Sequence, residues 1–366
     1  MQNSADKSSI HPAVFREGAH GYFASSNSGG GFYSLYDEVF GEKNFEHVYI
    51  LKGGPGTGKS TLIDKIAAHA SSLGLETDVF VCSSDNKSLD GLIIHELGTA
   101  ILDGTAPHTF DPSCPGVVGE IVNLGAMWDS AKLAGNRGEI FRAITGKSEN
   151  YARAYRLLSC AATAKRDILS VAGTAVLYEK MSVSCARLFA RNISSPGTGR
   201  VSHRFITGNT CGGVISLGTI DDLCETKITV SESGGTGYFY LDEVKKLALS
   251  KGADCMILPD PLLPDTTEAV YLPADKVFYK IASGEEYEEG NIRVNCARFA
   301  DTELLRKNRV RLRFSARIVE TLMEEALSSI AAAGEIHSGI EEFYKEAMNF
   351  DGVTEILGRL DEKIFG

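Results

Sequence analysis

The sequence predicts an α/β fold made of two tandem three-layer α/β/α domains with mostly parallel sheets, each carrying a helical extension. Three observations lead to this prediction. A short apolar run leads into a glycine-rich loop and an amphipathic helix, further apolar runs follow, and segments of the first half return in altered form in the second. Alternating strands and helices are typical of a parallel sheet with crossover helices.

Length and composition agree with this fold. A chain of 366 residues corresponds to two domains at roughly 150 residues each. Hydrophobic residues make up 43% and charged residues 23%, which is typical of a soluble globular protein. There is no run of about 18 apolar residues and no secretory signal, so we expect a cytoplasmic protein without a membrane partner. The net charge of −11 argues against a protein that coats nucleic acid, and the eight cysteines lack the spacing of a zinc site.

The predicted elements of the first half follow one another closely. Residues 46–52, EHVYILK, form a short apolar run with β-branched and aromatic residues, which predicts a buried strand. Apolar residues recur at helical spacing over 62–74. The runs 77–85 and 89–97 predict two more strands, and another strand-like stretch ends at Asp103.

The loop after the first strand matches the pattern GxxxxGK[ST] completely. Its residues are Gly53, Gly54, Pro55, Gly56, Thr57, Gly58, Lys59, Ser60 and Thr61. Glycines allow positive φ, so backbone N–H groups can surround an anion, and the following helix adds the positive end of its dipole. In this pattern Lys59 contacts the β- and γ-phosphates and the Ser60 hydroxyl binds Mg²⁺. The loop therefore predicts binding of Mg-ATP or another nucleoside triphosphate, as in P-loop NTPases.

A loop of this kind also needs an acidic residue near the metal. An apolar strand that ends in aspartate is the usual source, so Asp103 is the first candidate. Asp85 is the second, and it could instead cap a turn. Glu96 is a candidate base that orients water, or a residue at the edge of a strand. His108 either contacts substrate or is a hydrogen-bonded loop residue.

The second half looks like a copy of the first. The matching segments are Phe23 with Phe205, Asn27 with Asn209, 56–58 with 235–237, and 64–74 with 242–252, at shifts of 178 to 182 positions. Where the first copy has Lys59 and Ser60, the second has Tyr238 and Phe239, so the loop at 234–239 has lost its phosphate and metal ligands. We therefore expect a second domain that hydrolyses nothing, although it could bind a different ligand.

Each copy ends in a helical extension. We expect the first domain with its extension to span 15–195 and the second to span 200–366, with a linker at 194–199. Several arginines on these extensions could form a solvated face, bind an acidic partner or reach the nucleotide. They are Arg153, Arg156, Arg309 and Arg313. An arginine near the γ-phosphate would stabilise the charge that develops during phosphoryl transfer.

Four stretches carry a family resemblance, and the first of them contains the loop itself. They are ILKGGPGTGKSTL at 50–62, CSSDNKSLDG at 82–91, AILDGTAPH at 100–108 and DPSCPGVVGEIVNLGAMWD at 111–129. With these stretches and the duplicated layout, the chain resembles a bacterial group of P-loop proteins, common in Firmicutes, that are known only as predicted ATPases or nucleotide-kinase-like proteins. The resemblance implies the fold and a nucleotide, and no particular substrate. Second copies in that group can retain a phosphate loop, and this chain departs from that pattern at Tyr238 and Phe239.

Three functions are compatible with these features. The one we favour is a Mg-dependent ATPase, a hydrolase in which the single intact loop changes how the two domains pack against each other. The second is a kinase for a nucleotide or small metabolite, with the helical extension as a lid. The third is a nucleotide-binding scaffold with little turnover. A protein partner or a homo-oligomer is compatible with all three.

Overall fold

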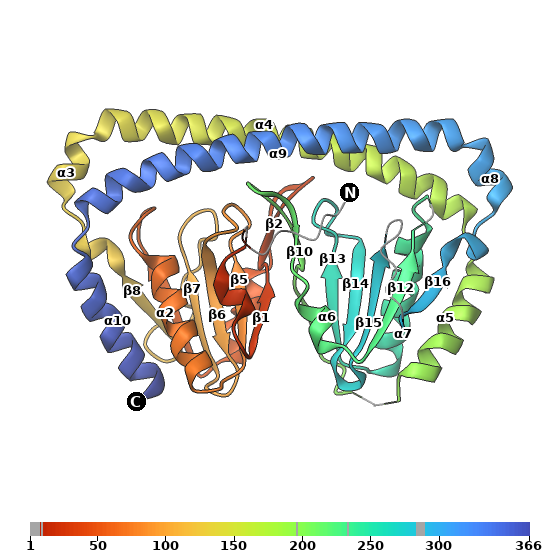
Figure 1. Ribbon diagram of the computed structural model, residues 1–366, viewed down its shortest axis with the longest axis horizontal. Coiled ribbons are helices and arrows are strands. Elements are labelled where there is room, and N and C mark those ends of the chain that lie inside the picture. Colours follow the sequence, from red (N-terminus) through yellow and green to blue (C-terminus); the bar gives the residue numbers. More distant parts are fainter. Residues whose placement is uncertain (1–7, 9, 195–196, 233, 283–289) are drawn as a thin grey trace.

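Two six-stranded sheets stand beside each other beneath a pair of long helices in the computed structural model (Figure 1). The structure describes residues 8, 10–194, 197–232, 234–282 and 290–366. Residues 195 and 196 of the expected linker lie outside the described residues. The arrangement confirms an α/β protein with two α/β units in tandem.

The first sheet contains the strand that precedes the glycine-rich loop. In spatial order its strands are β1 (Ala19–Tyr22), β5 (Thr77–Val81), β6 (Leu89–Ile94), β7 (Thr99–Asp103), β4 (His47–Lys52) and β8 (Gly119–Asn123). Strand β6 is antiparallel to β5 and β7, and the other neighbours are parallel. The helix α2 (Lys59–Ser72) connects β4 to β5, as expected. Strands β5, β6 and β7, in contrast, are joined by turns and not by crossover helices, which makes the sheet mixed.

The second sheet repeats this order. Its strands are β9 (Val201–His203), β13 (Cys255–Pro259), β14 (Thr267–Leu272), β15 (Val277–Ala282), β12 (Thr226–Ser231) and β16 (Ile292–Asn295). Strand β14 is the antiparallel member here, and α7 (Thr236–Lys251) takes the place of α2. The central strands of both sheets are almost fully buried, because helices or loops cover them, and this agrees with their continuous apolar sequences.

Shorter elements connect and separate the sheets. They are α1 (Tyr36–Val39), α6 (Thr219–Leu223), the hairpin strands β2 (Ser25–Ser28), β3 (Gly31–Ser34), β10 (Thr207–Thr210) and β11 (Gly213–Ser216), and the 3₁₀ helices η2 (Pro12–Phe15), η3 (Glu42–Asn44), η4 (Leu124–Met127), η5 (Pro273–Asp275) and η6 (Cys296–Phe299). The two hairpins lie between the sheets, where β2 contacts β10.

The helical extensions exchange partners between the two halves. The first extension is α3 (Ser130–Gly135), α4 (Arg137–Ala175) and α5 (Tyr178–Asn192), and the second is α8 (Thr302–Lys307), α9 (Arg309–Ala347) and α10 (Phe350–Phe365). Helices α4 and α9 have 39 residues each. A helix of this length spans about 58 Å, enough to cross both sheets. They pack side by side above them (Figure 1).

Each extension then ends on the opposite half. Met181, Cys185 and Phe189 of α5 are buried in the core of the second sheet. Val353 and Leu360 of α10 are buried in the core of the first. The boundaries at 15–195 and 200–366 therefore separate the two sheets, but each expected domain gives its last helix to the other and receives one in return.

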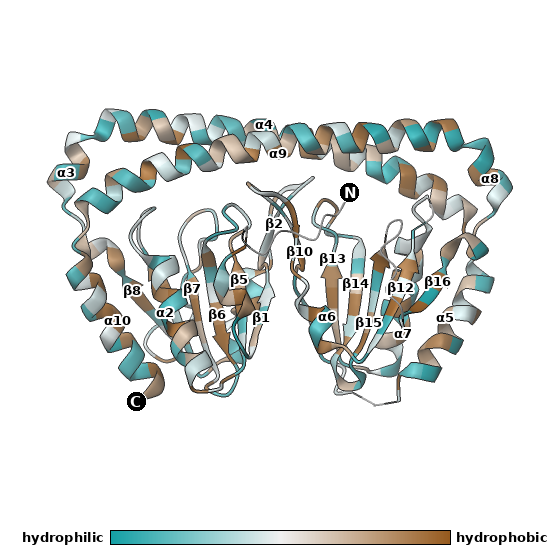
Figure 2. Cartoon of the chain, viewed as in Figure 1, coloured by the Kyte–Doolittle hydropathy of each residue, from teal (hydrophilic) through white to brown (hydrophobic). Residues whose placement is uncertain are grey.

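Apolar side chains concentrate in the sheets and at the centre of the helix pair (Figure 2). Small residues line the contact between α4 and α9, with Ala154 and Ala161 on one helix and Ala326 on the other. Small side chains let two helices approach closely. No helix in the described ranges is long and apolar enough to cross a membrane.

Candidate functional site

The glycine-rich loop has the backbone shape that its sequence predicts. Gly56 and Gly58 adopt φ angles of +68° and +91°, which glycine tolerates and most other residues do not. Helix α2 begins directly afterwards at Lys59 and continues for 14 residues. Its first N–H groups therefore point toward the loop, as in an anion-binding helix N-terminus.

The ammonium group of Lys59 lies inside the loop. Its Nζ donates to the carbonyl oxygens of Gly53 at 3.0 Å and Gly54 at 2.7 Å. It also lies 3.6 Å from Oδ2 of Asp103. Strands β4 and β7 are adjacent and parallel, with Leu51 opposite Asp103, so the carboxylate at the end of β7 reaches the lysine that follows β4. Lys59 is only 9% exposed, and its charge is balanced mainly by these oxygens.

Asp103 divides its two oxygens between the loop and its own turn. Oδ1 accepts hydrogen bonds from the backbone N–H of Thr105 at 2.9 Å and from its hydroxyl at 2.5 Å. Oδ2 faces Lys59. Asp103 is thus the carboxylate that lies against the loop lysine.

Asp85 caps a turn, which is the alternative that the sequence left open. Its carboxylate accepts hydrogen bonds from the N–H of Lys87 at 3.1 Å and from the hydroxyl of Ser88 at 2.6 Å. This turn lies next to the loop, because the N–H of Leu89 donates to Oγ of Ser60 at 2.9 Å. Asp85 therefore positions the strand that contacts Ser60.

Glu96 lies at the wrong end of the sheet for the role considered for it. It is exposed in the turn between β6 and β7, where its carboxylate accepts two hydrogen bonds from the N–H of Glu76, both at 3.1 Å. The next strand begins at Thr99, opposite His47 at the start of β4. The glycine-rich loop follows the other end of β4, so the prediction that Glu96 orients water there is wrong. The reversed direction of β6 is the reason.

The second half of the chain covers the loop from outside. A Cβ atom at Gly56 would lie 2.6 Å from the carbonyl oxygen of Glu341, and one at Gly54 would lie 2.5 Å from the ring of Tyr344. A Cβ at Gly58 would be 3.6 Å from Val353. Residue 56 is therefore restricted to glycine by packing as well as by backbone conformation, and residue 54 by packing. Helices α9 and α10 form the outer wall of the loop.

Two basic side chains lie on the helix pair next to this contact. Nζ of Lys147 on α4 is 3.3 Å from Nδ1 of His337 on α9, and Nε2 of His337 is 3.7 Å from the carboxylate of Glu341. Burial lowers the pKa of Lys147. Burial and then the Lys147 charge lower the pKa of His337. Both groups therefore lose their protons at a lower pH than exposed lysine and histidine side chains do.

None of the four candidate arginines reaches the loop. Arg153 pairs with Glu325 at 2.7 Å and is half exposed, and Arg156 is exposed on the same helix. Arg309 and Arg313 are exposed at the beginning of α9. The residues that touch the loop lie near the end of α9, about 42 Å further along it at ~1.5 Å per residue.

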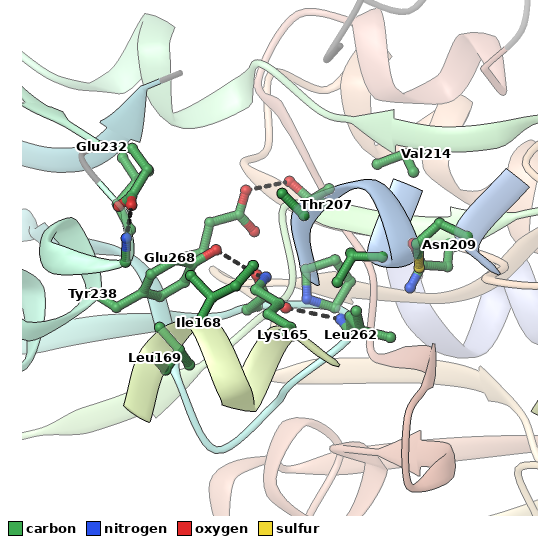
Figure 3. Close-up of a pocket in the computed structure, with 17 residues that line it drawn as sticks. Lys165, Ile168, Leu169, Thr207, Asn209, Val214, Glu232, Tyr238, Leu262 and Glu268 are labelled. Carbon is green, nitrogen blue, oxygen red and sulfur yellow. Dashed lines mark hydrogen bonds and ion pairs between the residues drawn. The ribbon is translucent and has the colours of Figure 1, made fainter. Parts of the chain in front are cut away.

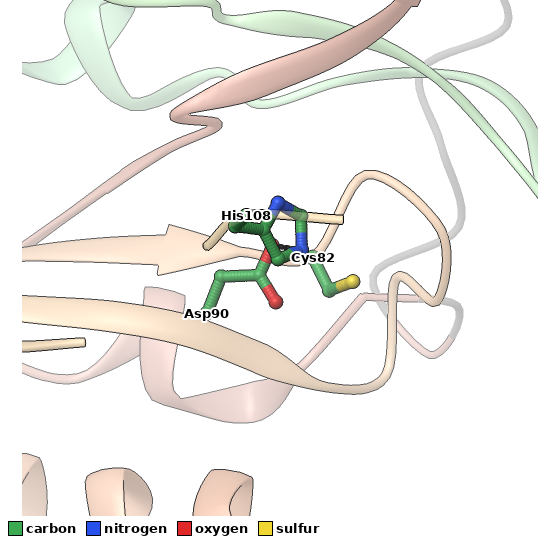
Figure 4. Close-up of side chains that lie close together, drawn as sticks. All are labelled: Cys82, Asp90 and His108. Atoms are coloured by element: carbon green, nitrogen blue, oxygen red, sulfur yellow. Dashed lines mark ion pairs between the residues drawn. The ribbon is translucent and has the colours of Figure 1, made fainter. Parts of the chain in front are cut away.

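His108 is buried and lies in a cluster with Asp90 and Cys82 (Figure 4). Its Nε2 is 3.4 Å from Oδ2 of Asp90, its ring stacks on Tyr36, and Cys82 lies beside both. The ligand atoms of Cys82, Asp90 and His108 are within 4.8 Å of one another. Burial raises the pKa of the Cys82 thiol well above its usual value, and metals bind the thiolate. We therefore interpret the cluster as a buried ion pair that supports the strand ends.

The twin loop of the second half already holds an anion of its own. The Glu232 carboxylate accepts a short hydrogen bond from the N–H of Gly235 and another from the N–H of Gly237 at 3.1 Å. These N–H groups correspond to those that would surround a phosphate in the first loop. Tyr238 and Phe239 stand in place of Lys59 and Ser60, and in addition the Glu232 carboxylate, which carries a negative charge as phosphate does, already occupies these N–H groups.

The sequence did not identify the residues that cover the loop or fill its twin. At a shift of 172 positions, the Asn-Arg pair at 136–137 aligns with the pair at 308–309, so the two extensions correspond to each other in sequence. This alignment does not indicate that each extension packs its last helix on the opposite sheet. Glu232 stands at the position of Gly53 when the loops are aligned at a shift of 179. An acidic residue in place of that glycine is a sequence feature from which an occupied second loop could have been predicted.

Comparisons of this chain with family models, with curated proteins and with solved structures give no match.

Proposed function

We propose that the chain binds Mg-ATP, or a related nucleoside triphosphate, at Gly53–Ser60 and hydrolyses it. The observation that carries the proposal is the position of the Lys59 ammonium, held by Gly53 and Gly54 and 3.6 Å from Asp103, at the start of a long helix. A lysine, two left-handed glycines and a helix N-terminus in one place form an anion-binding site with a cation at its centre.

The residues of the loop fit a magnesium-bound triphosphate. Mg²⁺ would neutralise phosphate charge and activate the terminal phosphoryl group. Ser60 offers the hydroxyl ligand, and Asp103 offers an acceptor that can hold a metal-bound water. Lys59 would release the Gly53 and Gly54 carbonyls and transfer its hydrogen bonds to phosphate oxygens. Such charge-assisted bonds are stronger than those to neutral carbonyls.

The packing of α9 on the loop supports a coupling between the nucleotide and the second half. Gly54 and Gly56 leave no space between the loop and Tyr344 or Glu341, so a movement of the loop toward α9 would press on this helix. The far end of α9 lies over the second sheet (Figure 1). Because a packed interface shifts between discrete arrangements, a small change at the loop can alter how the two halves pack.

A kinase is the second candidate, and one observation favours it. Lys147 on α4 and His337 on α9 lie together, α9 is one of the helices that cover the loop, and burial lowers the pKa of both groups. A lid with basic groups of this kind could bind and deprotonate a phosphate acceptor. A search for ADP formation that depends on an added acceptor distinguishes this candidate from hydrolysis.

Binding and turnover of ATP by the full chain test the proposal. Lys59→Ala should weaken ATP binding about 10- to 100-fold, because a charge-assisted hydrogen bond contributes about 1.5–3 kcal/mol. Lys65→Ala, an exposed lysine on the same helix, is the matched control and should leave binding unchanged. Phosphate release without an acceptor supports the ATPase, and tight binding with no turnover under any condition supports a scaffold. Equal affinity of wild type and Lys59→Ala would refute the nucleotide site.

A further inference from the structure

A cavity of about 380 Å³ lies in the second half, at the position that corresponds to the glycine-rich loop of the first (Figure 3). Its floor includes Tyr238, Asp260 and Glu268. In the repeat, Tyr238 aligns with Lys59, and at a shift of 178 Asp260 aligns with Cys82 and Glu268 with Asp90. Helices α4 and α9 form its roof. Its volume is within the range of small-molecule sites.

The polar groups of this cavity disfavour an anion. Glu232, Asp260 and Glu268 line it, and Lys165 is the basic residue among its lining residues. Lys165 forms an ion pair with Asp260 through a short contact, so its charge is already balanced. The lining therefore carries more negative than positive charge, and Glu232 occupies the N–H groups that would otherwise bind phosphate.

Asp260 is saturated and cannot recognise a ligand. One of its oxygens accepts hydrogen bonds from the N–H groups of Leu262 at 3.0 Å and Leu263 at 2.9 Å. The other accepts from the hydroxyl of Tyr238 at 3.0 Å and from Lys165. Recognition must come from the other acceptors that line the cavity.

Asn209 supplies such an acceptor. It is fully buried and lines the cavity, and its Oδ1 atom has no hydrogen-bond partner within the described part of the chain. The equivalent atom in the first half, Oδ1 of Asn27, accepts from the hydroxyl of Tyr155 at 2.9 Å. A shift of 172 places Leu327 where α4 has Tyr155, so the second half lacks this donor. A buried acceptor without a donor is costly unless something binds it.

Glu268 is the second acceptor. Only 6% of this residue is exposed, and its Oε1 accepts from the hydroxyl of Thr207 at 3.0 Å. Thr207 and Asn209 are two positions apart on β10 and therefore face the same side of the hairpin. Glu268 and Asn209 thus both line one cavity, with Thr207 beside Glu268 (Figure 3).

The rest of the cavity is apolar. Ile168 and Leu169 of α4 and Val319 and Met323 of α9 line the roof. A carboxylate and an amide oxygen beside such a surface match a ligand with a cationic, hydrogen-donating head and a short hydrocarbon body. We propose that this cavity binds a small organic cation, an alkyl guanidinium or alkyl ammonium compound, with its N–H groups directed to Glu268 and to Oδ1 of Asn209.

Affinity should depend on pH through Glu268. Burial and then the charge of Asp260 raise the pKa of Glu268 to about 7, against the opposing effects of Thr207, Lys280 and Lys165. Tyr238 and Glu232 line the same cavity. A cation binds the ionised carboxylate, so binding should strengthen from pH 6 to pH 8.

Isothermal titration of the full chain with n-butylguanidinium tests the proposal, with n-butanol and butyrate as neutral and anionic probes of the same length. We expect the guanidinium compound to bind at least about tenfold more tightly than the alcohol, the size of effect expected for one charge-assisted hydrogen bond. Glu268→Gln should remove this preference, and Val319→Trp should abolish binding by filling the cavity. Lys251→Ala, exposed on the same half, is the control and should change nothing.

Both cavity variants should keep ATP binding at the first loop, which shows that they fold and separates this test from that of the nucleotide site. No heat of binding for the guanidinium compound at millimolar concentration would overturn the proposal. Equal affinity for the alcohol, tighter binding of butyrate, or binding that survives Val319→Trp would overturn it as well.

Discussion

Asn27 and Asn209 hold each other by reciprocal hydrogen bonds at the centre of the molecule. The Nδ2 group of each donates to the backbone oxygen of the other, both at 2.8 Å. The backbones of Phe23 and Phe205 do the same, at 2.8 and 3.0 Å. The residues that the internal repeat pairs in the sequence thus touch each other in space. An approximate two-fold axis passes between them and relates the two halves.

The two asparagines differ in their other partners, and this predicts unequal costs of removal. Asn27 also donates to the backbone oxygen of Ser83 at 3.1 Å and accepts from Tyr155. Asn27→Ala should therefore lower the free energy of unfolding by about 2–4 kcal/mol, since each buried partner left unsatisfied costs about 1–3 kcal/mol. Asn209→Ala should cost less. Urea unfolding monitored by circular dichroism measures both, and a larger loss for Asn209→Ala would contradict this account of the axis.

The exchange of terminal helices predicts that neither half is stable alone. A fragment of residues 1–195 lacks Val353 and Leu360 of α10, which fill the first core, and it exposes the face of α5 that packs on the second sheet. We expect this fragment to bind a hydrophobic dye and to aggregate, because a large exposed apolar surface favours association. Co-expression with residues 200–366 should restore a soluble complex. A monomeric, cooperatively unfolding 1–195 fragment would show that α10 is dispensable.

Matched substitutions can distinguish the role of Asp103 in Mg²⁺ binding from that of Asp85. Asp103→Asn should weaken the Mg²⁺ dependence of ATP binding about tenfold or more, the usual effect of altering a group that orients a metal ligand. Asp85→Asn should leave this dependence in place and only loosen the turn that it caps. Titration of ATP with and without Mg²⁺ measures both variants. The reverse result would assign the metal-side acid to Asp85.

Gly56 and Gly58 are a pair in which strain and packing can be distinguished. Alanine at either position is strained by about 1–2 kcal/mol, because both residues have positive φ. At Gly56 the added Cβ would also lie 2.6 Å from the Glu341 carbonyl on α9, whereas at Gly58 it would make only an ordinary contact with Val353 at 3.6 Å. Gly56→Ala should therefore lower the thermal midpoint more than Gly58→Ala. Equal midpoints would mean that α9 does not rest on the loop.

Glu268 should make the stability of the protein fall with pH. Its pKa is about 7 when folded, against a usual value of 4.5, so between these pH values the folded protein keeps a proton that the unfolded chain has released. Its contribution is complete below pH 4.5 and is lost as pH rises through 7. Glu268→Gln removes this loss and should be more stable than wild type at pH 8, by at most about 3 kcal/mol. Denaturant unfolding at pH 5 and pH 8 measures the difference, and an identical pH dependence of the two proteins would contradict the raised pKa.

The sequence by itself determined the local features of this protein. The spacing from Gly53 to Ser60 has only a few backbone solutions, so it predicted the left-handed glycines and the helix start at Lys59. The run that ends at Asp103 predicted the carboxylate beside the lysine, because parallel neighbouring strands end at the same edge. The repeat predicted a second sheet with the same strand order.

Only the tertiary structure decided what depends on contacts between distant segments. The reversed strand β6 moved Glu96 to the far edge, and a strand's direction depends on how its turns pack rather than on its own residues. The length of α4 and α9 allowed the extensions to reach the opposite half, yet α5 and α10 are amphipathic and could have packed on either sheet. Because α10 packs on the first sheet, the end of α9 that precedes it brings Glu341 and Tyr344 over the glycine-rich loop. In the second half, Leu327 stands at the position of Tyr155, and Asn209 faces a cavity. These relationships arise from complementary shape and charge across the fold, and a linear pattern of residues does not record them.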